Sequence, residues 1–388
     1  MQFGLTETQR VLKNSAREFF PAVCPIAEVR RLLETETAYD AALWQKMAQQ
    51  GWAGIIFSEE YGGLGLGLVE MAVALEEMGR ALLPGPYLST VLLAGAAIDA
   101  AGNPDQKRKY LSRIAAGEAR GTLALLEPDA RWDPEGVKLE ARPTPAGVVL
   151  NGRKMFVPDA AAADFVICAA RRGAELGLFV VPRNARGLTI CRLPAIDETR
   201  KLYQVDFAGV AVGEDDFLAI GDSACAALDR ALAVATVALT AEMVGGMQRV
   251  MEIAVSYAKT RQQFGKPIGQ FQAVQHLCAD MLLLTESSRS AAYYAAWTLQ
   301  ERAPEAEAAV SIAKAYASEA YREVGNRGIQ VQGGMGFTWE NSVHLYYKRA
   351  KASELMFGDA AYHRERIARL VIDKSCPQSN NSSISAAV

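Results

Sequence analysis

The spacing of apolar residues divides the chain into three stretches of different character. From Thr6 to about Ala116, apolar positions recur every three or four residues in runs rich in Ala, Leu, Glu and Arg, which predicts amphipathic helices. From Gly121 to about Leu218, short β-branched runs alternate with turns, which predicts strands. From about Ser223 to Asp373, long alanine-rich helical patterns return. This order predicts a β domain inserted between two α-helical parts, not the βαβ alternation of a nucleotide-binding sheet.

Two glycine-containing motifs add detail to this picture. Asn151-Gly152, inside GVVLNGRKMFV, predicts a hairpin turn between two strands. The run GGLGLG at residues 62–67 has the wrong spacing for a dinucleotide-binding fingerprint, and no βαβ unit frames it. We interpret it as a loop between helices.

Composition and charge narrow the class of protein. Half of the 388 residues are apolar and 22% are charged, which is typical of a globular protein. The net charge of −3 comes from 41 basic and 44 acidic side chains that are mixed along the sequence, so we expect neither nucleic acid nor an anionic membrane as a partner. We expect no signal peptide and no membrane span, since no uninterrupted apolar stretch reaches roughly 18 residues.

Cysteine and histidine are too sparse for most metal or triad chemistry. The six cysteines contain no CxxC pair, and the chain has only three histidines. We therefore expect reduced thiols in a cytoplasmic protein and no metal site. Any difficult chemistry is expected to come from an organic cofactor.

The segment from Tyr257 to Met281 is the most informative part of the sequence. It places Arg261, Phe264 and Gly265 in a compact turn between two helical segments. A cation and an aromatic ring at such a corner suit an anionic ligand that also carries a flat ring. A second motif, QVQGGMGFTWE at Gln330 to Glu340, allows backbone amides to approach a ligand closely, because glycine has no Cβ. Taken alone, this second motif is equally typical of a loop that ends a helix.

Together with YGGLG and NGRKMFV, these motifs resemble the acyl-CoA dehydrogenase family over nearly the whole chain. The resemblance implies an α+β, mostly α fold. It has an N-terminal helical domain at 1–117, a middle β-barrel-like domain at 118–220 and a C-terminal four-helix-bundle domain at 221–374, and we expect a disordered tail at 375–388.

The resemblance also implies the ligands of the protein. FAD is the expected cofactor, an acyl-CoA thioester the expected substrate and an electron-transfer flavoprotein the expected electron acceptor. In the family, residues that match Arg261, Phe264, Gln330, Gly333 and Gly334 hold the adenosine half of an FAD bound by a neighbouring subunit. A homo- or hetero-tetramer is therefore expected.

The positions that match the flavin end of this family depart from its pattern. Where the family has E-P-x-A-G-S-D, the chain has Glu127-Pro128-Asp129-Ala130-Arg131-Trp132-Asp133, and its K-x-W-[IV]-[TS] strand is replaced by Lys154-Met155-Phe156-Val157-Pro158. Phe156 can still pack on a flavin ring. Pro158 supplies no hydroxyl and no backbone N–H, and Arg131 and Trp132 replace small residues.

The family's catalytic base is also missing from its usual position. The glutamate before a glycine is replaced by Phe357, which cannot accept a proton, and the alternative position on the preceding long helix is Ala235. Two carboxylates are candidates to replace it. Glu242 returns to the face of Ala235 after seven residues, about 10.5 Å further along the helix, and Asp359 lies two residues beyond Phe357. Each also has a structural interpretation, Glu242 as a buried paired carboxylate and Asp359 as a helix N-cap.

Three functional hypotheses follow from these departures. The first is an FAD-dependent acyl-CoA dehydrogenase in which Glu242 or Asp359 is the base. The second is a non-catalytic partner subunit, which supplies the adenosine clamp to a homologous catalytic subunit. The third is a relative that works as a flavin oxidase or monooxygenase.

Overall fold

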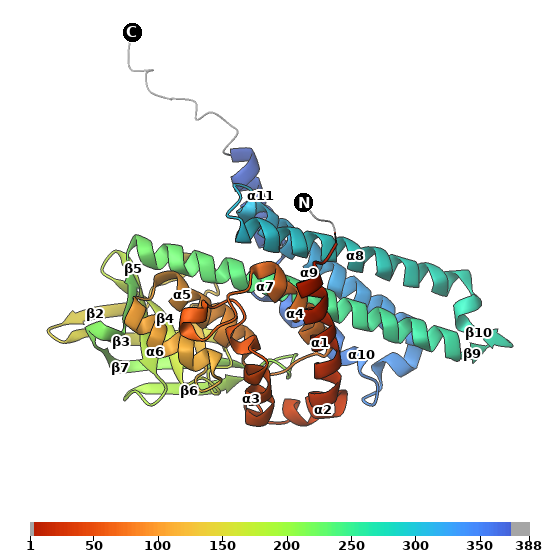
Figure 1. Cartoon of the computed structure of the whole chain (residues 1–388), viewed down its shortest axis with the longest axis horizontal. Coiled ribbons are helices and arrows are strands. Elements are labelled where there is room, and N and C mark those ends of the chain that lie inside the picture. Colours follow the sequence, from red (N-terminus) through yellow and green to blue (C-terminus); the bar gives the residue numbers. More distant parts are fainter. Residues whose placement is uncertain (1–3, 374–388) are drawn as a thin grey trace, which may run out of the picture.

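The structure is a computed structural model that describes residues 4–373, so the tail predicted at 375–388 lies outside it. The N-terminal part is helical (Figure 1). It contains α1 (Glu7–Val23), α2 (Ile26–Leu33), α3 (Ala41–Gln49), α4 (Leu68–Arg80), a π-helical stretch at Leu88–Gly95, α5 (Ala96–Ala101) and α6 (Pro104–Ala115).

The middle part is a single sheet. Its strands are β1 (Gly121–Ala124), β2 (Glu140–Thr144), β3 (Gly147–Pro158), β4 (Phe165–Arg172), β5 (Glu175–Pro182), β6 (Leu188–Leu193), β7 (Leu202–Val212) and β8 (Phe217–Ile220). The strand order is β6-β7-β3-β2-β4-β5-β8, and β1 pairs in parallel with β4.

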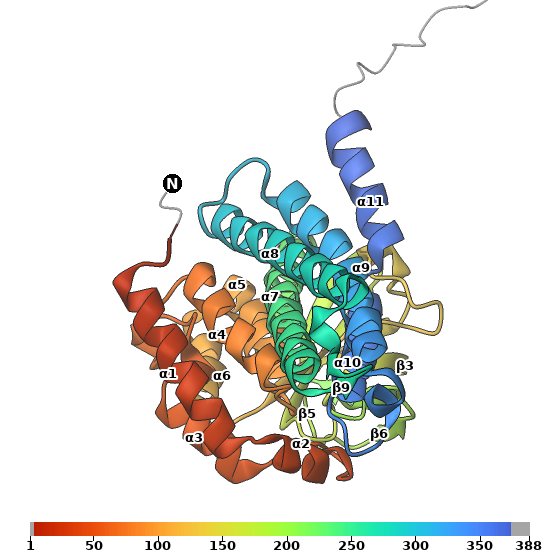
Figure 2. The same ribbon diagram turned by 90° about the vertical axis from the view of Figure 1, so that its right-hand side faces the viewer.

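The C-terminal part returns to helices. It consists of α7 (Asp222–Thr260), the two-residue strands β9 (Gln262–Gln263) and β10 (Lys266–Pro267), α8 (Gln272–Gln300), α9 (Ala306–Gln332), α10 (Val343–Leu355) and α11 (Ala360–Ala368). In the turned view, α1, α4, α7 and α9 follow one another across the molecule (Figure 2). The predicted fold class, mostly α with a β middle part between two helical parts, is confirmed.

The predicted hairpin turn at Asn151-Gly152 is wrong. Both residues lie inside β3, and the turn comes earlier, where Thr144 pairs with Gly147. The pairing of β3 with β7 shifts register between Leu150 and Asn151, and Gly152 has a φ of +144°. The Asn-Gly pair therefore accompanies a bulge in the long strand, because sheet pairing overrides the local turn preference.

The strands divide their side chains between two apolar clusters. In β4, Phe165, Ile167 and Ala169 belong to the large cluster that also contains the helices. Their neighbours Val166, Cys168 and Ala170 point to the other face and into a smaller cluster within the middle part. This period of two places one face of the sheet against the N-terminal helices and α7.

Helices α4 and α7 pack with almost no space between their backbones. A Cβ added at Gly245 of α7 would overlap the carbonyl oxygen of Glu76, and one added at Gly79 of α4 would overlap that of Glu242. Glycine is therefore required on both helices at this seam. The side chains of the two glutamates at this seam form ion pairs with different partners. Glu76 pairs with Lys13 and Arg289. Glu242 pairs with Arg200 and Arg349.

By length and composition, α7 could cross a membrane, but two-thirds of its most apolar window is buried inside the protein. It packs against α4, α8 and α9. A central core helix is apolar on all sides for the same reason, so this feature is weak evidence for a membrane.

Candidate functional site

The predicted corner at Arg261 and Phe264 is a small hairpin between α7 and α8. Gln263 pairs with Lys266, and the two loop residues, Phe264 and Gly265, have φ angles of +53° and +76°. Two positive φ angles are the requirement of a type I′ turn. A bulky residue in this conformation costs about 1–3 kcal/mol. The Phe264 side chain is nevertheless 91% exposed, so the fold holds an aromatic ring in solvent at an energetic cost.

The second predicted motif caps the end of α9. Gln330 lies exposed in the last turn, and Gly333 follows the helix with a φ of +59°. A Cβ added at Gly333 or Gly334 would meet nothing within 4 Å. The Gly333 N–H donates to the carbonyl oxygen of Gln330, but the space beside both glycines is open, so a ligand can approach the backbone of the loop.

The corner and the glycine loop lie at the same end of the C-terminal helices. A Cβ at Gly328 of α9 would overlap Val250 of α7, so the two helices touch there. They run in the same direction because α8 returns the chain between them (Figure 1). A cation at Arg261, a flat ring at Phe264 and an accessible glycine backbone at Gly333 and Gly334 together fit the adenosine half of a dinucleotide.

The predicted flavin end lies toward the other end of α7 and is a small apolar pocket. Apolar side chains line it, among them Leu123, Leu125, Trp132, Met155, Leu232 and Phe357. Its volume is about 20 Å³, which leaves room for about one water molecule. A flavin ring and a thioester do not fit into this pocket as it stands.

Two aromatic rings fill the space. Trp132 and Phe357 meet edge to face with their centroids 5.4 Å apart. Phe357 has a φ of +60° and is only 5% exposed. The ring that replaces the family's base is therefore packed into the pocket, and its partner is the tryptophan that replaces a small residue.

Two buried side chains fix the loop that carries Phe357. Lys314 Nζ donates to the carbonyl oxygen of Gly358 at 2.7 Å, and His363 Nε2 donates to that of Phe357 at 3.0 Å. Burial lowers the pKa of Lys314 to about 7 and that of His363 to about 3. His363 is thus a neutral donor, and no described residue bonds its Nδ1. Neither residue was singled out from the sequence.

The first residues of the two altered flavin motifs bond to each other. Lys154 Nζ lies 2.8 Å from Glu127 Oε1, and the same oxygen accepts from the backbone N–H groups of Lys138 and Leu139. The pair is buried and structural. Phe156, one of the predicted flavin contacts, lies at the rim of the pocket with its side chain 43% exposed and a φ of +54°.

Glu242, the first candidate base, is bonded to two arginines. Its Oε2 accepts from Arg200 Nη2 at 2.6 Å, and its Oε1 accepts from Arg349 Nη1. Arg349 also donates to Asp197 at 2.6 Å, and all four side chains are buried. Both carboxylate oxygens therefore face cations, and neither faces the pocket around Phe357.

Asp359, the second candidate, begins helix α11. Its Oδ1 accepts from the backbone N–H of Tyr362 at 2.8 Å, the geometry of an N-cap. Its side chain is exposed, outside the residues that line the pocket. Ala235, at the alternative base position, is buried in α7.

The structure also contains a buried carboxyl that the sequence did not indicate. Asp159 follows the pocket residue Pro158 and accepts from Ser89 Oγ at 2.7 Å. Burial raises its pKa to about 6, and its Oδ1 has no hydrogen-bond partner among the described residues. Only the sheet and the π-helical stretch together bring Asp159 and Ser89, 70 residues apart, into contact.

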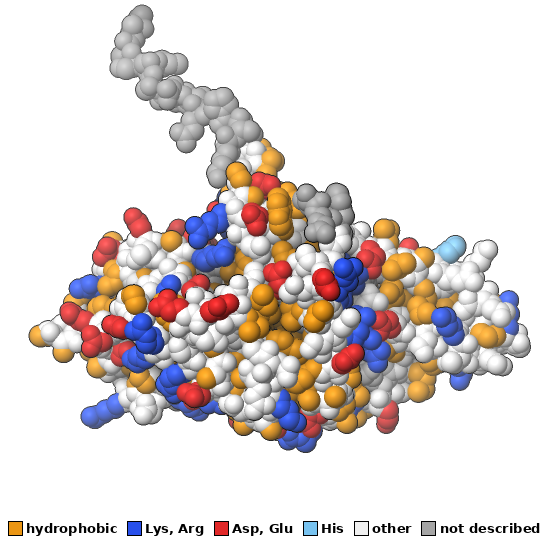
Figure 3. Space-filling view, in the orientation of Figure 1, with side chains coloured by type: hydrophobic (Ala, Val, Ile, Leu, Met, Phe, Trp, Pro, Cys, Tyr) orange, Lys and Arg blue, Asp and Glu red, His pale blue; other side chains and the backbone are white. Residues whose placement is uncertain are grey.

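Charged side chains of both signs are mixed over the visible surface (Figure 3). Among residues 4–373, no three His, Cys, Asp or Glu side chains are grouped so that they could hold a metal ion.

Comparison with known proteins places these residues in a family context. The chain matches the family models described as the acyl-CoA dehydrogenase N-terminal domain over residues 6–118, middle domain over 122–206 and C-terminal domain over 226–372. It is 30% identical over 382 residues to the probable acyl-CoA dehydrogenase YngJ of Bacillus subtilis, an alignment that covers 96% of this chain and all of that protein.

Two solved structures extend the comparison. The ChsE4-ChsE5 complex of Mycobacterium tuberculosis contains a chain with 27% identity and a TM-score of 0.88, with 97% of this chain and all of that chain covered. The FAD complex of PigA has 26% identity and a TM-score of 0.88, with 95% and 98% covered. The similarity thus extends over almost the entire length of both chains.

Proposed function

Since the chain belongs to the acyl-CoA dehydrogenase family, we propose that it takes part in the α,β-dehydrogenation of an acyl-CoA thioester as one subunit of a mixed oligomer. Members of this family are oxidoreductases, and their cofactor is FAD. In our proposal, this chain holds the adenosine half of an FAD whose flavin ring lies in a homologous partner subunit.

The observation that carries the proposal is the packing of Trp132 against Phe357. In our proposal, these two rings fill the space that a flavin and a thioester would need, while Phe264, proposed for the adenosine half, is exposed to solvent. When bound in the partner, FAD would accept the hydride that leaves the substrate. The part of this chain would be to bind and orient the dinucleotide with Arg261, Phe264, Gln330 and the glycine loop.

The length of α7 supports a shared cofactor. Leu232 in the pocket and Arg261 at the corner are 29 residues apart on one continuous helix, or about 44 Å along its axis. An extended dinucleotide does not span this distance. This distance supports the proposal that the corner at Arg261 binds an FAD whose flavin lies in another subunit, whether that subunit is a second copy or a different chain.

The candidate bases support the same division of labour. Glu242 is bonded to Arg200 and Arg349, and Asp359 caps α11, so both carboxylates have structural partners. The proton acceptor is accordingly assigned to the partner subunit. The ChsE4-ChsE5 structure is a precedent for a complex of two different chains in this fold.

A self-sufficient dehydrogenase is the second candidate, and Phe156 favours it. Its ring is exposed at the pocket rim in a strained conformation, as a platform for a flavin would be. In this case, Trp132 and Phe357 would have to move when the cofactor binds. For both candidates we propose an electron-transfer flavoprotein as the electron acceptor.

Flavin content separates the two candidates. The full chain is purified alone and after co-expression with its homologous partner, and flavin per chain is measured by absorbance after denaturation. We expect a flavin-poor protein alone and flavin only in the mixed assembly. A lone protein that carries one flavin per chain and is bleached by an acyl-CoA would contradict the proposal.

A second experiment tests the pocket directly. The double variant Trp132→Ser, Phe357→Glu reopens the space and restores a carboxylate. We expect this variant to retain more flavin alone than the wild type does, and the matched variant Trp52→Ser, a buried tryptophan elsewhere, to retain none. If the double variant folds and binds no more flavin than the wild type, the two rings are not what closes the site.

A further inference from the structure

A second cavity lies outside the family's cofactor and thioester sites. It is formed where the end of α1 and the link to α2 face the end of α4, and Arg249 of α7 and Tyr346 of α10 complete it. Its volume is about 300 Å³, more than ten times that of the pocket beside Phe357. A volume of this size is at the lower end of the range for small-molecule sites.

One wall of the cavity is cationic. Arg17, Arg80 and Arg249 line it together with a single carboxylate, Glu77, and two of the arginines lie at its mouth, because the side chains of Arg17 and Arg249 are 46% and 42% exposed. Arg80 is more buried, and its backbone carbonyl accepts a hydrogen bond of 2.7 Å from the Tyr346 hydroxyl. The Tyr346 ring thus lines the cavity, while its hydroxyl is already bonded to the backbone of Arg80.

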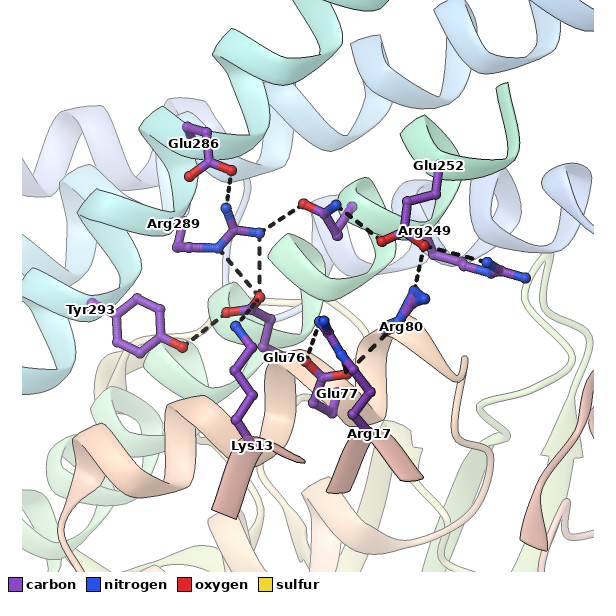
Figure 4. A network of polar contacts seen from close by, with 11 residues as sticks. Lys13, Arg17, Glu76, Glu77, Arg80, Arg249, Glu252, Glu286, Arg289 and Tyr293 are labelled. Carbon is purple, nitrogen blue, oxygen red and sulfur yellow. Dashed lines mark hydrogen bonds and ion pairs between the residues drawn. The ribbon is translucent and has the colours of Figure 1, made fainter. Parts of the chain in front are cut away.

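Carboxylates hold these arginines in place. Glu77 accepts from Arg17 Nε and Nη2 at 3.1 and 2.8 Å, and Glu252 accepts from Arg80 Nη1 at 2.6 Å and from Arg249 Nη1 at 3.3 Å (Figure 4). A guanidinium group has five N–H donors, whereas a carboxylate has about four acceptor positions. The three guanidinium groups therefore have more N–H donors than the two carboxylates can accept. The five groups together carry one net positive charge.

The rest of the polar network does not cancel this charge. Beyond the cavity, Glu76 bonds to Lys13, Arg289 and the Tyr293 hydroxyl, and Arg289 also pairs with Glu286 (Figure 4). This outer half contains two cations and two carboxylates. The single excess cation thus belongs to the arginines at the cavity.

Other residues that line the cavity are apolar. They include Ala16, Phe20 and Pro21 of α1 together with Cys24 and Ile26. Burial raises the pKa of the Cys24 thiol to about 12, so this side chain is neutral and behaves as a small apolar group. The cavity therefore combines apolar surface with pre-oriented guanidinium groups.

We propose that this cavity binds a small organic monocarboxylate with a short apolar tail. The guanidinium groups match the planar carboxylate, one net positive charge balances one negative charge, and Phe20, Pro21 and Ile26 bury the tail. A doubly charged phosphate would be only half neutralised and would leave the apolar surface exposed. The ion pairs with Glu77 and Glu252 hold the arginines in position before the ligand arrives, which lowers the entropic cost of binding.

Calorimetric titration of the full chain with sodium hexanoate tests the proposal. Hexan-1-ol has the tail without the charge, and inorganic phosphate has charge without the tail. We expect saturable binding of one hexanoate per chain, with binding of both control compounds at least tenfold weaker. Equal binding of hexanoate and hexan-1-ol, or tighter binding of phosphate, would overturn the proposal.

Two variants locate the site, one by a change of charge and one by a change of volume. Arg249→Gln removes a cation that makes only a 3.3 Å contact with Glu252, and Ala81→Leu fills space in the cavity without a change of charge. Each is expected to weaken hexanoate binding at least tenfold, whereas Arg142→Gln, an exposed arginine on β2, should leave it unchanged. Thermal unfolding of each variant confirms that it is folded. Wild-type affinity in both folded variants would show that hexanoate binds elsewhere and would refute the assignment.

Discussion

The two ends of the predicted cofactor site are built in opposite ways. At the Arg261 corner, a strained and exposed phenylalanine stands in solvent beside a glycine loop with open space around it. Around Phe357, strained phenylalanines lie in or beside a pocket that the protein's own rings fill. In our proposal, a ligand shared with another subunit completes the first end, whereas side chains of this chain already fill the second. The family's motifs are thus kept at the first end and altered at the second.

The largest expected effect concerns Glu242, the first candidate base. Its replacement tests whether the end of the site around Phe357 retains a base. Replacement by alanine leaves Arg200 and Arg349 buried without their shared carboxylate, so we expect the free energy of unfolding to fall by about 3–5 kcal/mol. Turnover per folded assembly should remain unchanged. Urea unfolding and steady-state kinetics measure the two effects separately.

The exposed pair Glu365 and Arg369 is the control for this change. Glu365→Ala should alter stability by less than about 0.5 kcal/mol. If Glu242→Gln folds normally and loses turnover, Glu242 is a base after all, and the comparison between the two ends fails.

The next effect is a loss of stability at low pH, which arises at the end of the site around Phe357. His363 holds the Phe357 loop, and its pKa is lowered by burial from 6.5 to about 3 in the folded protein. The unfolded chain therefore binds a proton that the folded chain does not, so stability falls as the pH drops from 6.5 toward 3, by on the order of 4 kcal/mol. Fluorescence of Trp132, which packs on Phe357, should change over the same range.

The contribution of His363 is obtained by subtracting the pH profile of His363→Gln from that of the wild type. Asp159, whose pKa is raised to about 6, acts in the opposite direction between pH 3.8 and 6, since its folded form binds the extra proton. The difference between the wild type and His363→Gln removes it. The exposed His276→Gln should retain the full acid response. An identical pH profile for the wild type and His363→Gln would show that the loop is held by other groups.

A smaller effect is expected at the open end, where stability and binding should change in opposite directions. Phe264→Asn creates Asn-Gly, the preferred pair for a type I′ turn, and should raise stability by about 1 kcal/mol. The same change removes the ring that faces the ligand, so FAD affinity of the mixed assembly should fall by about 2 kcal/mol, or roughly thirtyfold. Flavin titration with calorimetric unfolding measures both.

Arg261→Ala should weaken FAD binding to a similar extent. It should bring no gain in stability, because the backbone of Arg261 is not strained. Arg142→Ala is the matched exposed control. Unaltered flavin content in both corner variants would mean that this end does not hold the cofactor.

The smallest effect is expected at Asp359. Asparagine caps a helix as well as aspartate does, so Asp359→Asn should leave stability and turnover unchanged, whereas Asp359→Ala should cost about 1 kcal/mol. A base would behave differently, because asparagine cannot accept the proton. Loss of turnover in Asp359→Asn alone would identify this residue as catalytic.

The sequence predicted those features that local patterns determine. The helical and strand periods gave the order of the three parts, and the corner at Arg261 follows from a turn between two helical patterns. The resemblance to the family identified Phe357 as the residue at the usual position of the base, where a phenylalanine cannot accept a proton. The two interpretations of Glu242 and Asp359 were both stated, but periodicity could not choose between them.

The remaining features depend on contacts between distant segments. The partners of Glu242 lie 42 and 107 residues away in the sequence, and no local pattern links them. The same holds for Lys314, 44 residues from Gly358, and for the contact of Trp132 with Phe357. The hairpin turn predicted at Asn151-Gly152 was wrong for a related reason. Pairing of β3 with β7 and β2 outweighed the local preference of Asn-Gly for a turn.

The seam between α4 and α7 has a consequence for how the protein comes apart. Gly79 and Gly245 let the two helices share one continuous apolar core, so we expect the first and last thirds of the chain to open together. Amide hydrogen exchange should be slowest along this seam, and both helices should open in one cooperative step. Proteolytic cleavage within the middle strands would then leave the two helical fragments associated. The parts that the sequence separates as domains are, in this sense, one folding unit.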